Sequence, residues 1–356
     1  MSILFRYLSR EILVAGGLAL AILLGLFTFF DFIAELGDAH TDTYTPLVAL
    51  AFVTLNTPVR LYELVPVALL IGALFAWNRL ALSSEFAVMR TAGLSLPRLV
   101  TWMILLGLAV GGVALLLGEY VTPHAERMAK QLKARATTGV VAREFRTGLW
   151  AKDGGTFINV REMRPDASLH GIRLFVFDAN FHLKAIRHAE EAVWSSGRWT
   201  LLQVTETLIS QDQTRTTRLP DQVWSSAVTP DLLSVLMVAP ERMSIATLNA
   251  YVDHLRENRQ DAGRYEIALW NKIIYPLAGP IMLMLALAFA YRPPRSGGAG
   301  GRLLIGVLLG LGFHLSNRLV GQTVQLLDWP PPVAALVPMA VIGTLACLAL
   351  WHLDRR

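Results

Sequence analysis

The sequence predicts an α-helical integral membrane protein with six transmembrane helices and an inserted β domain. Of its 356 residues, 54% are hydrophobic and only 17% are charged, whereas soluble proteins carry about 25% charged residues. Six stretches are long and apolar enough to cross a bilayer. Between the third and the fourth lies a polar block, residues 119–272, which contains short runs typical of β-strands.

Each predicted span rests on length and charge. A helix rises about 1.5 Å per residue, so about 20 apolar residues cross a hydrocarbon core of about 30 Å. Five of the stretches contain no Asp, Glu, Lys or Arg, and the fifth contains only Arg318. The second and fifth have the weakest patterns. The six stretches are residues 12–30, 64–78, 99–118, 273–291, 303–324 and 329–353.

The orientation follows from the short loops. Arginines precede the first span, lie between spans two and three and between spans four and five, and end the chain, whereas residues 36–59 contain no Lys or Arg. The positive-inside rule therefore places both termini in the cytoplasm and the polar block on the other side. The first span lacks a signal cleavage site, so we expect it to remain as an anchor. The net charge of +5 reflects these loops and does not indicate nucleic-acid binding.

The polar block is expected to form a β-sandwich or jelly roll. Strands are predicted at 156–160, 174–177 and 181–186, with a turn at 178–180, and a hairpin at 189–209 that turns at 195–197. In its second strand, one face would carry Trp199, Leu201 and Gln203, and the other Leu202 and Val204. Phe157, Phe175 and Phe177 either form an apolar ligand-binding surface or, as we favour, fill the core.

A short helix should connect this block to the fourth span. Ser244 is placed as its N-cap. Ile245, Leu248, Val252 and Leu255 follow at helical spacing.

Known catalytic constellations are missing from the sequence. There is no phosphate-binding Gly-x4-Gly-Lys-Ser/Thr loop and no Gly-x-Ser-x-Gly elbow. The glycine-rich run at 297–301 lacks the lysine and is best explained as a linker. The histidines lack the Cys or carboxylate neighbours of a metal site, and Cys347 has no partner for a disulfide. We therefore expect no catalytic residues, no metal and no cofactor in this chain.

The loop between spans two and three, residues 81–93, carries the first candidate site. Ser83 or Ser84 could cap a short helix that includes Glu85 and Arg90, and Gly93 could end it. Phe86, Val88 and Met89 would give this helix a partly apolar surface. Such a helix could dock in a groove of a soluble partner or lie on lipid, and the pattern does not separate the two.

Two further clusters could contact a ligand. In span five, His314, Arg318, Gln322 and Gln325 share one helical face, which we expect to line a polar cavity rather than meet lipid. After span three, Arg127, Lys130 and Lys133 form a basic stripe that could bind phosphate groups or simply face water. Gly-x3-Gly pairs at 107/111 and 306/310 permit close helix packing, although such pairs also arise by chance.

Several motifs make the chain resemble the lipopolysaccharide export permeases of the LptF/LptG family, and within it the G-type members. The resemblance covers essentially the whole chain. The motifs are Gly-Leu-Trp-Ala-Lys-Asp-Gly at 148–154, Gln-Asp-Ala-Gly-Arg-Tyr at 260–265, Ser84-Glu85 with Val88-Met89 and Gly93, and Gly118-Glu119-x-Val121-x-Pro123.

The resemblance implies a transport subunit that is not an enzyme. In such a system, a G-type and an F-type permease form a heterodimer in the bacterial inner membrane. A dimer of the ATPase LptB binds ATP and drives the complex, and LptC joins it in the periplasm. Lipopolysaccharide is extracted and passed to a bridge toward the outer membrane. The polar block would be a periplasmic β-jelly roll, so the domains would be 1–125, 126–260 and 261–356.

The resemblance also assigns residues. Ser84, Glu85, Phe86, Met89 and Arg90 would belong to the coupling helix that contacts the ATPase. Lys130 and Lys133 match basic positions that face lipopolysaccharide phosphates, and Arg127, His314 and Arg318 are added to the lipid-contacting set by placement alone.

One departure concerns the outer end of span one, where family members can carry lysines. Here Asp31, Glu35 and Asp38 occur instead. Arg60, Arg127 or Arg318 would then have to supply positive charge.

Three alternatives remain open from the sequence. The chain could be the F-type subunit, a secondary transporter with His314 and Arg318 as its site, or a membrane enzyme acting on envelope lipids. The absence of internal repeats disfavours the second, and the absence of catalytic constellations disfavours the third.

Overall fold

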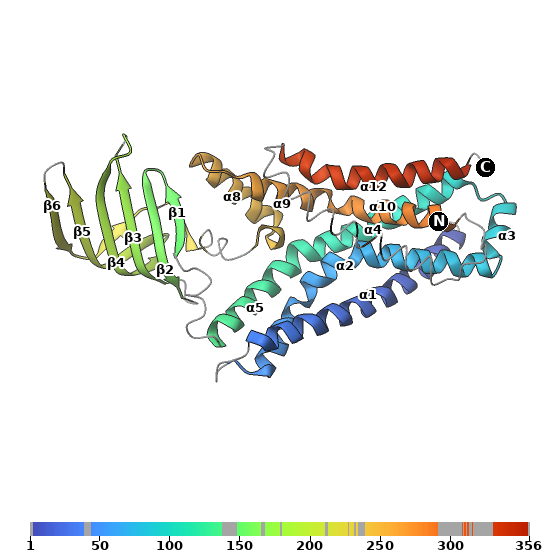
Figure 1. The fold of residues 1–356 in the computed structure, drawn as a ribbon, viewed down its shortest axis with the longest axis horizontal. Coiled ribbons are helices and arrows are strands. Elements are labelled where there is room, and N and C mark those ends of the chain that lie inside the picture. Colours follow the sequence, from blue (N-terminus) through green and yellow to red (C-terminus); the bar gives the residue numbers. More distant parts are fainter. Residues whose placement is uncertain are drawn as a thin grey trace.

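The computed structural model separates a long helical bundle from a β-sheet domain (Figure 1). The structure describes residues 3–38, 44–136, 148–164, 168–178, 180–210, 213–226, 228–230, 233, 239–290, 308, 310, 312, 315 and 330–354. Both ends of the described chain lie at the end of the bundle that is distant from the sheet (Figure 1).

The described residues contain five helices that are long and apolar enough to cross a membrane. They are α1 (Ile3–Asp38), α2 (Pro46–Leu82), the continuous unit of α4 (Leu96–Leu116), a π-helical turn η1 (Leu117–Val121) and α5 (Thr122–Ala136), the unit of α9 (Gly263–Ile274), η3 (Tyr275–Leu277) and α10 (Ala278–Ala290), and α12 (Pro331–Asp354). The predicted fifth span at 303–324 lies largely outside the described residues.

Helices α1 and α2 and the α4–α5 unit all extend well beyond their predicted spans. Helix α2 has 37 residues, about 55 Å at 1.5 Å per residue, so its first turns occupy part of the expected loop at 36–59. The third helix does not end at residue 118, because η1 carries the helix on into α5.

At the centre of the bundle, the backbone of α4 touches the backbone of η3 and α10. A Cβ atom on Gly107 would lie 2.3 Å from the backbone N of Pro280, and one on Gly111 would lie 2.6 Å from the carbonyl oxygen of Pro276. The Gly107/Gly111 pair therefore allows close helix packing, because α4 lies directly on η3 and α10. Gly310 of the second pair lies close to Val67 in α2, and Gly306 lies outside the described residues.

The inserted β domain is one antiparallel sheet of seven strands. Strands β1 to β6 pair in chain order, and β7 pairs with β5. This order is a meander, without the Greek-key connections of a jelly roll among the described strands. The strands are β1 (Leu149–Asp153), β2 (Thr156–Met163), β3 (Leu169–Phe177), β4 (Leu183–Ser195), β5 (Arg198–Ile209), β6 (Thr214–Leu219) and β7 (Gln222–Trp224).

The predicted hairpin is confirmed as β4–β5, with Ser196 and Gly197 both at positive φ in its two-residue turn. The face assigned to Val204 in its second strand is wrong. Gln203 has a φ of +54° and, like Glu190 opposite it, drops out of the pairing between β4 and β5, although the register is the same on both sides. Beyond Gln203, Val204 lies on the same buried face as Trp199 and Leu201.

The sheet buries one face and leaves the other partly open. The buried face carries Ile158, Val160, Ile172, Leu174 and Trp199. Phe157, Phe175 and Phe177 do not belong to this core, so the expectation that they fill it is wrong. They are half-buried on the opposite face, where Phe157 and Phe177 pack edge to face.

Helix α8 (Ile245–Glu257) lies between the sheet and α9 (Figure 1). Its predicted N-cap is confirmed, because the Ser244 side chain accepts a hydrogen bond from the backbone N–H of Thr247 at 3.0 Å. Leu248, Val252 and Leu255 of the predicted apolar stripe are buried, together with Tyr251. A short 3-10 turn, η2 (Pro240–Arg242), precedes the helix.

Gly107→Val should destabilise the bundle, because the new side chain would meet the backbone of α10. Overpacking of this kind typically costs 1–3 kcal/mol. The control is Gly112→Val, since nothing lies within 4 Å of a Cβ at that position. Thermal unfolding in detergent should show a lower midpoint for the Gly107 variant alone, and equal midpoints would contradict the backbone contact.

Candidate functional site

The loop between spans two and three forms a short helix, α3 (Glu85–Thr91), at the end of the bundle distant from the sheet (Figure 1). Neither serine caps it in the expected way. Ser84 occupies the N-cap position with a φ of +60° and makes no side-chain cap bond. The Ser83 hydroxyl instead donates to Glu85 Oε1 at 2.9 Å. The expected serine cap is therefore wrong, because the tight turn after α2 places Ser84 in the left-handed region.

The end of α3 matches the prediction for Gly93, which has a φ of +93°. Its N–H donates to the Arg90 carbonyl, and the N–H of Leu94 donates to the Met89 carbonyl, both at 3.1 Å. These two bonds define a Schellman motif, in which glycine is the preferred residue at positive φ. The Arg90 side chain adds a hydrogen bond to the Leu94 carbonyl.

The apolar residues of α3 divide between its two faces. Met89 is buried in the bundle core, and Phe86 packs edge to face on Trp77 of α2. These two side chains hold the helix to its own chain, so the expected exposed surface of Phe86 and Met89 is wrong. Val88 is 64% exposed and provides the outward apolar contact.

Glu85 is held by the start of α1, a contact that the sequence analysis missed. The Tyr7 hydroxyl donates to Glu85 Oε2 at 2.7 Å. This bond and that from Ser83 lower the pKa of the Glu85 carboxyl. A second link, at 2.9 Å, joins Arg79 near the end of α2 to Glu11 of α1. Helix α3 is thus tied to the first span as well as to the second.

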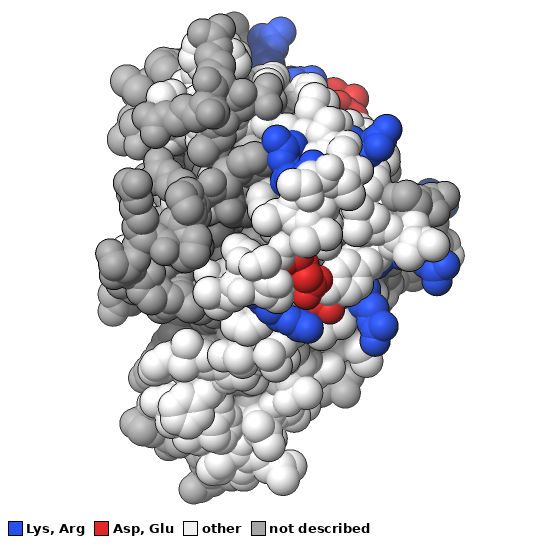
Figure 2. Space-filling view, turned by 90° about the vertical axis from the view of Figure 1, so that its right-hand side faces the viewer, with Lys and Arg blue, Asp and Glu red and all other residues white. Residues whose placement is uncertain are grey.

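An open cavity of about 370 Å³ lies beside α3. Its lining combines apolar side chains with exposed polar atoms, and Arg98 is the charged residue; it consists of Leu4, Met89, Ala92, Gly93, Leu94, Arg98 and Trp102. Figure 2 shows this end of the molecule, where basic side chains are spread over the surface and acidic ones occupy smaller areas. The surface around α3 therefore combines apolar and basic groups.

The expected phosphate stripe forms on α5, but two of its three cations are paired within the chain. Lys130 contacts Glu126 at 3.2 Å, and Lys133 contacts Glu35 of α1 at 2.5 Å. Lys133 also lies over the rings of Tyr44 and Phe52. Arg127 is exposed and makes no ion pair with another described residue.

The acidic residues at the far end of α1 are neutralised by the same packing. Arg60 of α2 makes a two-pronged contact with Asp31, at 2.7 and 2.8 Å, and also bonds to Glu63. Arg60 is therefore committed to its own bundle, which argues against it as a replacement for the family's lysines. His314, Arg318, Gln322 and Gln325 lie outside the described residues.

Together these features define a class: a multi-pass membrane protein with a short helix at one end of its bundle and an inserted β domain at the other. The described residues contain no group of His, Cys, Asp or Glu that could hold a metal ion.

Comparison with known proteins identifies the family within that class. Residues 6–353 match the family described as "Lipopolysaccharide export system permease LptF/LptG", and the chain belongs to it. It is 32% identical over 353 residues to the "Lipopolysaccharide export system permease protein LptG" of Haemophilus influenzae, covering 99% of this chain and 98% of that protein. The protein of the same name from Escherichia coli strain K12 is 31% identical over 357 residues, with the same coverage.

Tyr7→Phe should raise the pKa of the Glu85 carboxyl toward its ordinary value, because it removes the strongest donor that lowers this pKa. Glu85 would then protonate at a higher pH than in the parent protein. The carboxyl carbon can be titrated by ¹³C NMR in nanodiscs. Tyr120→Phe, at an exposed tyrosine on η1, is the control, and an unchanged pKa in the Tyr7 variant would refute the contact.

Proposed function

We propose that this chain is the G-type permease subunit of an ATP-driven exporter that extracts lipopolysaccharide from the bacterial inner membrane and passes it to a periplasmic bridge. The family match and the two relatives named LptG support the G-type subunit over the F-type alternative. The same names favour it over a secondary transporter and over a membrane enzyme.

The observation that carries the mechanism is the placement of α3 and the β domain at opposite ends of continuous helices (Figure 1). The α3 end, with its basic surface and both termini, would face the cytoplasm. The sheet would then lie in the periplasm. Motion imposed on α3 reaches α1 through Tyr7 and α2 through Trp77. The chain itself would transmit this motion along its helices and would not hydrolyse ATP.

The arrangement is compatible with the partners that the family resemblance implies. The exposed side of α3 would dock on one subunit of an LptB dimer, which binds the ATP, so this chain needs no cofactor of its own. Helix α1 exposes apolar side chains along its length, including Leu18, Ile22 and Phe30. That surface would meet the F-type permease across a lipid cavity, and LptC would join on the periplasmic side.

Val88→Arg should weaken copurification with the ATPase and lower lipopolysaccharide export about tenfold, because it places a charge at the outward apolar contact of α3. The fold should persist, since Val88 is 64% exposed. Val223→Arg is the matched control, at a valine of 62% exposure in β7. Normal ATPase binding by the Val88 variant would remove α3 from the interface.

Substitution of Phe86 is a less selective test, because Phe86 also packs on Trp77. An aspartate there should uncouple ATP turnover from export by loosening the attachment of α3 to α2.

Arg127→Glu should reduce photocrosslinking of lipopolysaccharide to α5 several-fold, because Arg127 is the exposed cation of the basic stripe. Lys184→Glu, at an exposed lysine in β4, should leave crosslinking unchanged. The same reversal at Lys133 should instead destabilise the bundle, since it would place two carboxylates together at Glu35. Equal crosslinking in the Arg127 and Lys184 variants would count against the stripe as a lipid contact.

A further inference from the structure

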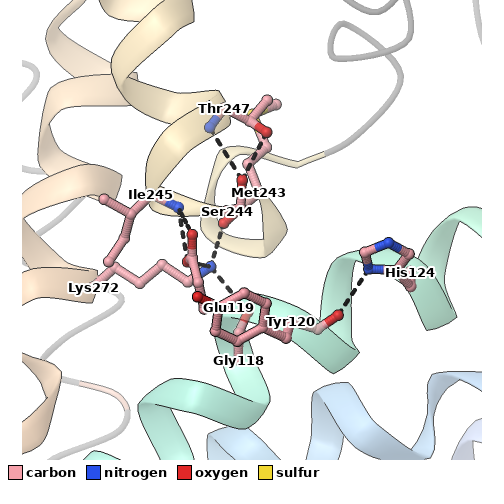
Figure 3. Close-up of polar contacts among 9 residues, drawn as sticks. All are labelled: Gly118, Glu119, Tyr120, His124, Met243, Ser244, Ile245, Thr247 and Lys272. Atoms are coloured by element: carbon pink, nitrogen blue, oxygen red, sulfur yellow. Dashed lines mark hydrogen bonds and ion pairs between the residues drawn. The ribbon is translucent and has the colours of Figure 1, made fainter.

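The Gly118-Glu119-x-Val121-x-Pro123 motif forms a polar joint between the membrane bundle and α8 (Figure 3). Both carboxylate oxygens of Glu119 accept from the backbone N–H of Ile245, at 2.9 and 2.8 Å. Ile245 is the first residue of α8, whose N-terminus favours a negative charge. Glu119 therefore fastens the start of α8 to the end of the third span.

Lys272 completes the joint from α9. Its ammonium group donates to the carbonyl oxygens of Gly118, at 3.0 Å, and Met243, and lies 3.4 Å from Glu119 Oε2. Lys272 is only 4% exposed. One buried cation thus joins three segments: its own helix α9, the π-helical turn, and the stretch before α8. Separating any of them would leave a buried charge short of a partner, which is strongly unfavourable.

The π-helical turn explains why the motif contains proline. The N–H of Thr122 bonds to the carbonyl of Leu117, five residues earlier. The next bond of this register would join residue 123 to the Gly118 carbonyl, but Pro123 has no N–H. That carbonyl is therefore available to Lys272. Gly118 itself is required, because a Cβ there would lie 2.6 Å from the Tyr62 ring.

The other end of α8 is attached to the sheet. Asn258, which follows α8, accepts from the backbone N–H of Gly154 through its side chain at 2.9 Å. Its carbonyl accepts from Lys152 at 3.4 Å. Both partners belong to the Gly-Leu-Trp-Ala-Lys-Asp-Gly motif of the β1–β2 turn. The 13 residues of α8, about 20 Å of helix, are thus held at both ends.

We propose that Glu119 and Lys272 are positioning residues that, through α8, hold the β domain in a fixed orientation over the bundle for handover of lipid. This inference rests on the proposed function and adds that the two ends of the bundle have separate roles. The joint lies at the opposite end of α4 from α3, so it governs transfer to the periplasmic side and leaves ATP turnover unaffected.

The test uses the full complex in nanodiscs, with Cys347→Ser so that labels attach only at introduced cysteines. Spin labels at Met128→Cys on α5 and Val223→Cys on β7, both exposed positions, report the distance between the bundle and the sheet. Glu119→Gln, which removes the charge with little change in shape, should widen this distance distribution at least twofold. Glu241→Gln, at an exposed residue of η2, is the control.

The same samples are assayed for ATP hydrolysis and for ATP-dependent release of lipopolysaccharide. Glu119→Gln should lower release about tenfold and keep hydrolysis within twofold of the parent. An unchanged distance distribution overturns the joint, and a wider one with normal release overturns its role in handover. Loss of both activities together also overturns it. If the parent complex releases no lipopolysaccharide, the proposed function fails, whereas the distance measurement still decides the joint.

A charge exchange, Glu119→Lys with Lys272→Glu, separates this joint from a simple ion pair. An isolated pair would recover in the double variant. Here release should stay low and distances wide, because a lysine opposes the N-terminus of α8 and a carboxylate cannot donate to Gly118 and Met243. Recovery would show that only the charges matter and would overturn the positioning argument. Lys272→Met, which removes the cation alone, should reproduce the Glu119→Gln result.

Discussion

The buried ammonium group of Lys272 is the constraint on which the two halves of this molecule depend. Burial of a charge is tolerated only when it is paired and hydrogen-bonded, and its partners come from segments far apart in the sequence. The bundle and the connecting helix α8 therefore share one polar centre, and the sheet is attached at the other end of α8. Most other contacts between the halves could lengthen gradually, whereas the hydrogen bonds of Lys272 are either formed or broken.

Much of the architecture could be predicted because it follows from local patterns. Apolar runs indicate spans, Ser244 is a recognisable N-cap, and the Ser-Gly turn with its flanking strands indicates the β4–β5 hairpin. The Gly93 end of α3 is equally local. Helix length was harder to judge: α2 and the α4–α5 unit continue past their apolar runs because tertiary contacts, and the π-helical turn, stabilise residues whose composition suggests a loop.

The candidate site was harder to predict because its contacts join distant residues. Nothing in the sequence around Lys133 indicates Glu35 as its partner, or Tyr7 as the partner of Glu85. The same is true of Phe86 and Met89, whose spacing fits an exposed or a buried face equally well. Gln203 gave a usable signal, since the alternation of β5 is imperfect there, and its positive φ accompanies the change of buried face.

The contact of Gly107 with the backbone of α10 has a mechanical consequence. Helices that touch through long side chains can slide, because the side chains change rotamers as they pass. Spans three and four touch main chain to main chain and have no such freedom, so they move as one rigid unit. A displacement of this unit at one side of the bilayer therefore tilts both helices together, and the other end of the unit moves by a similar distance.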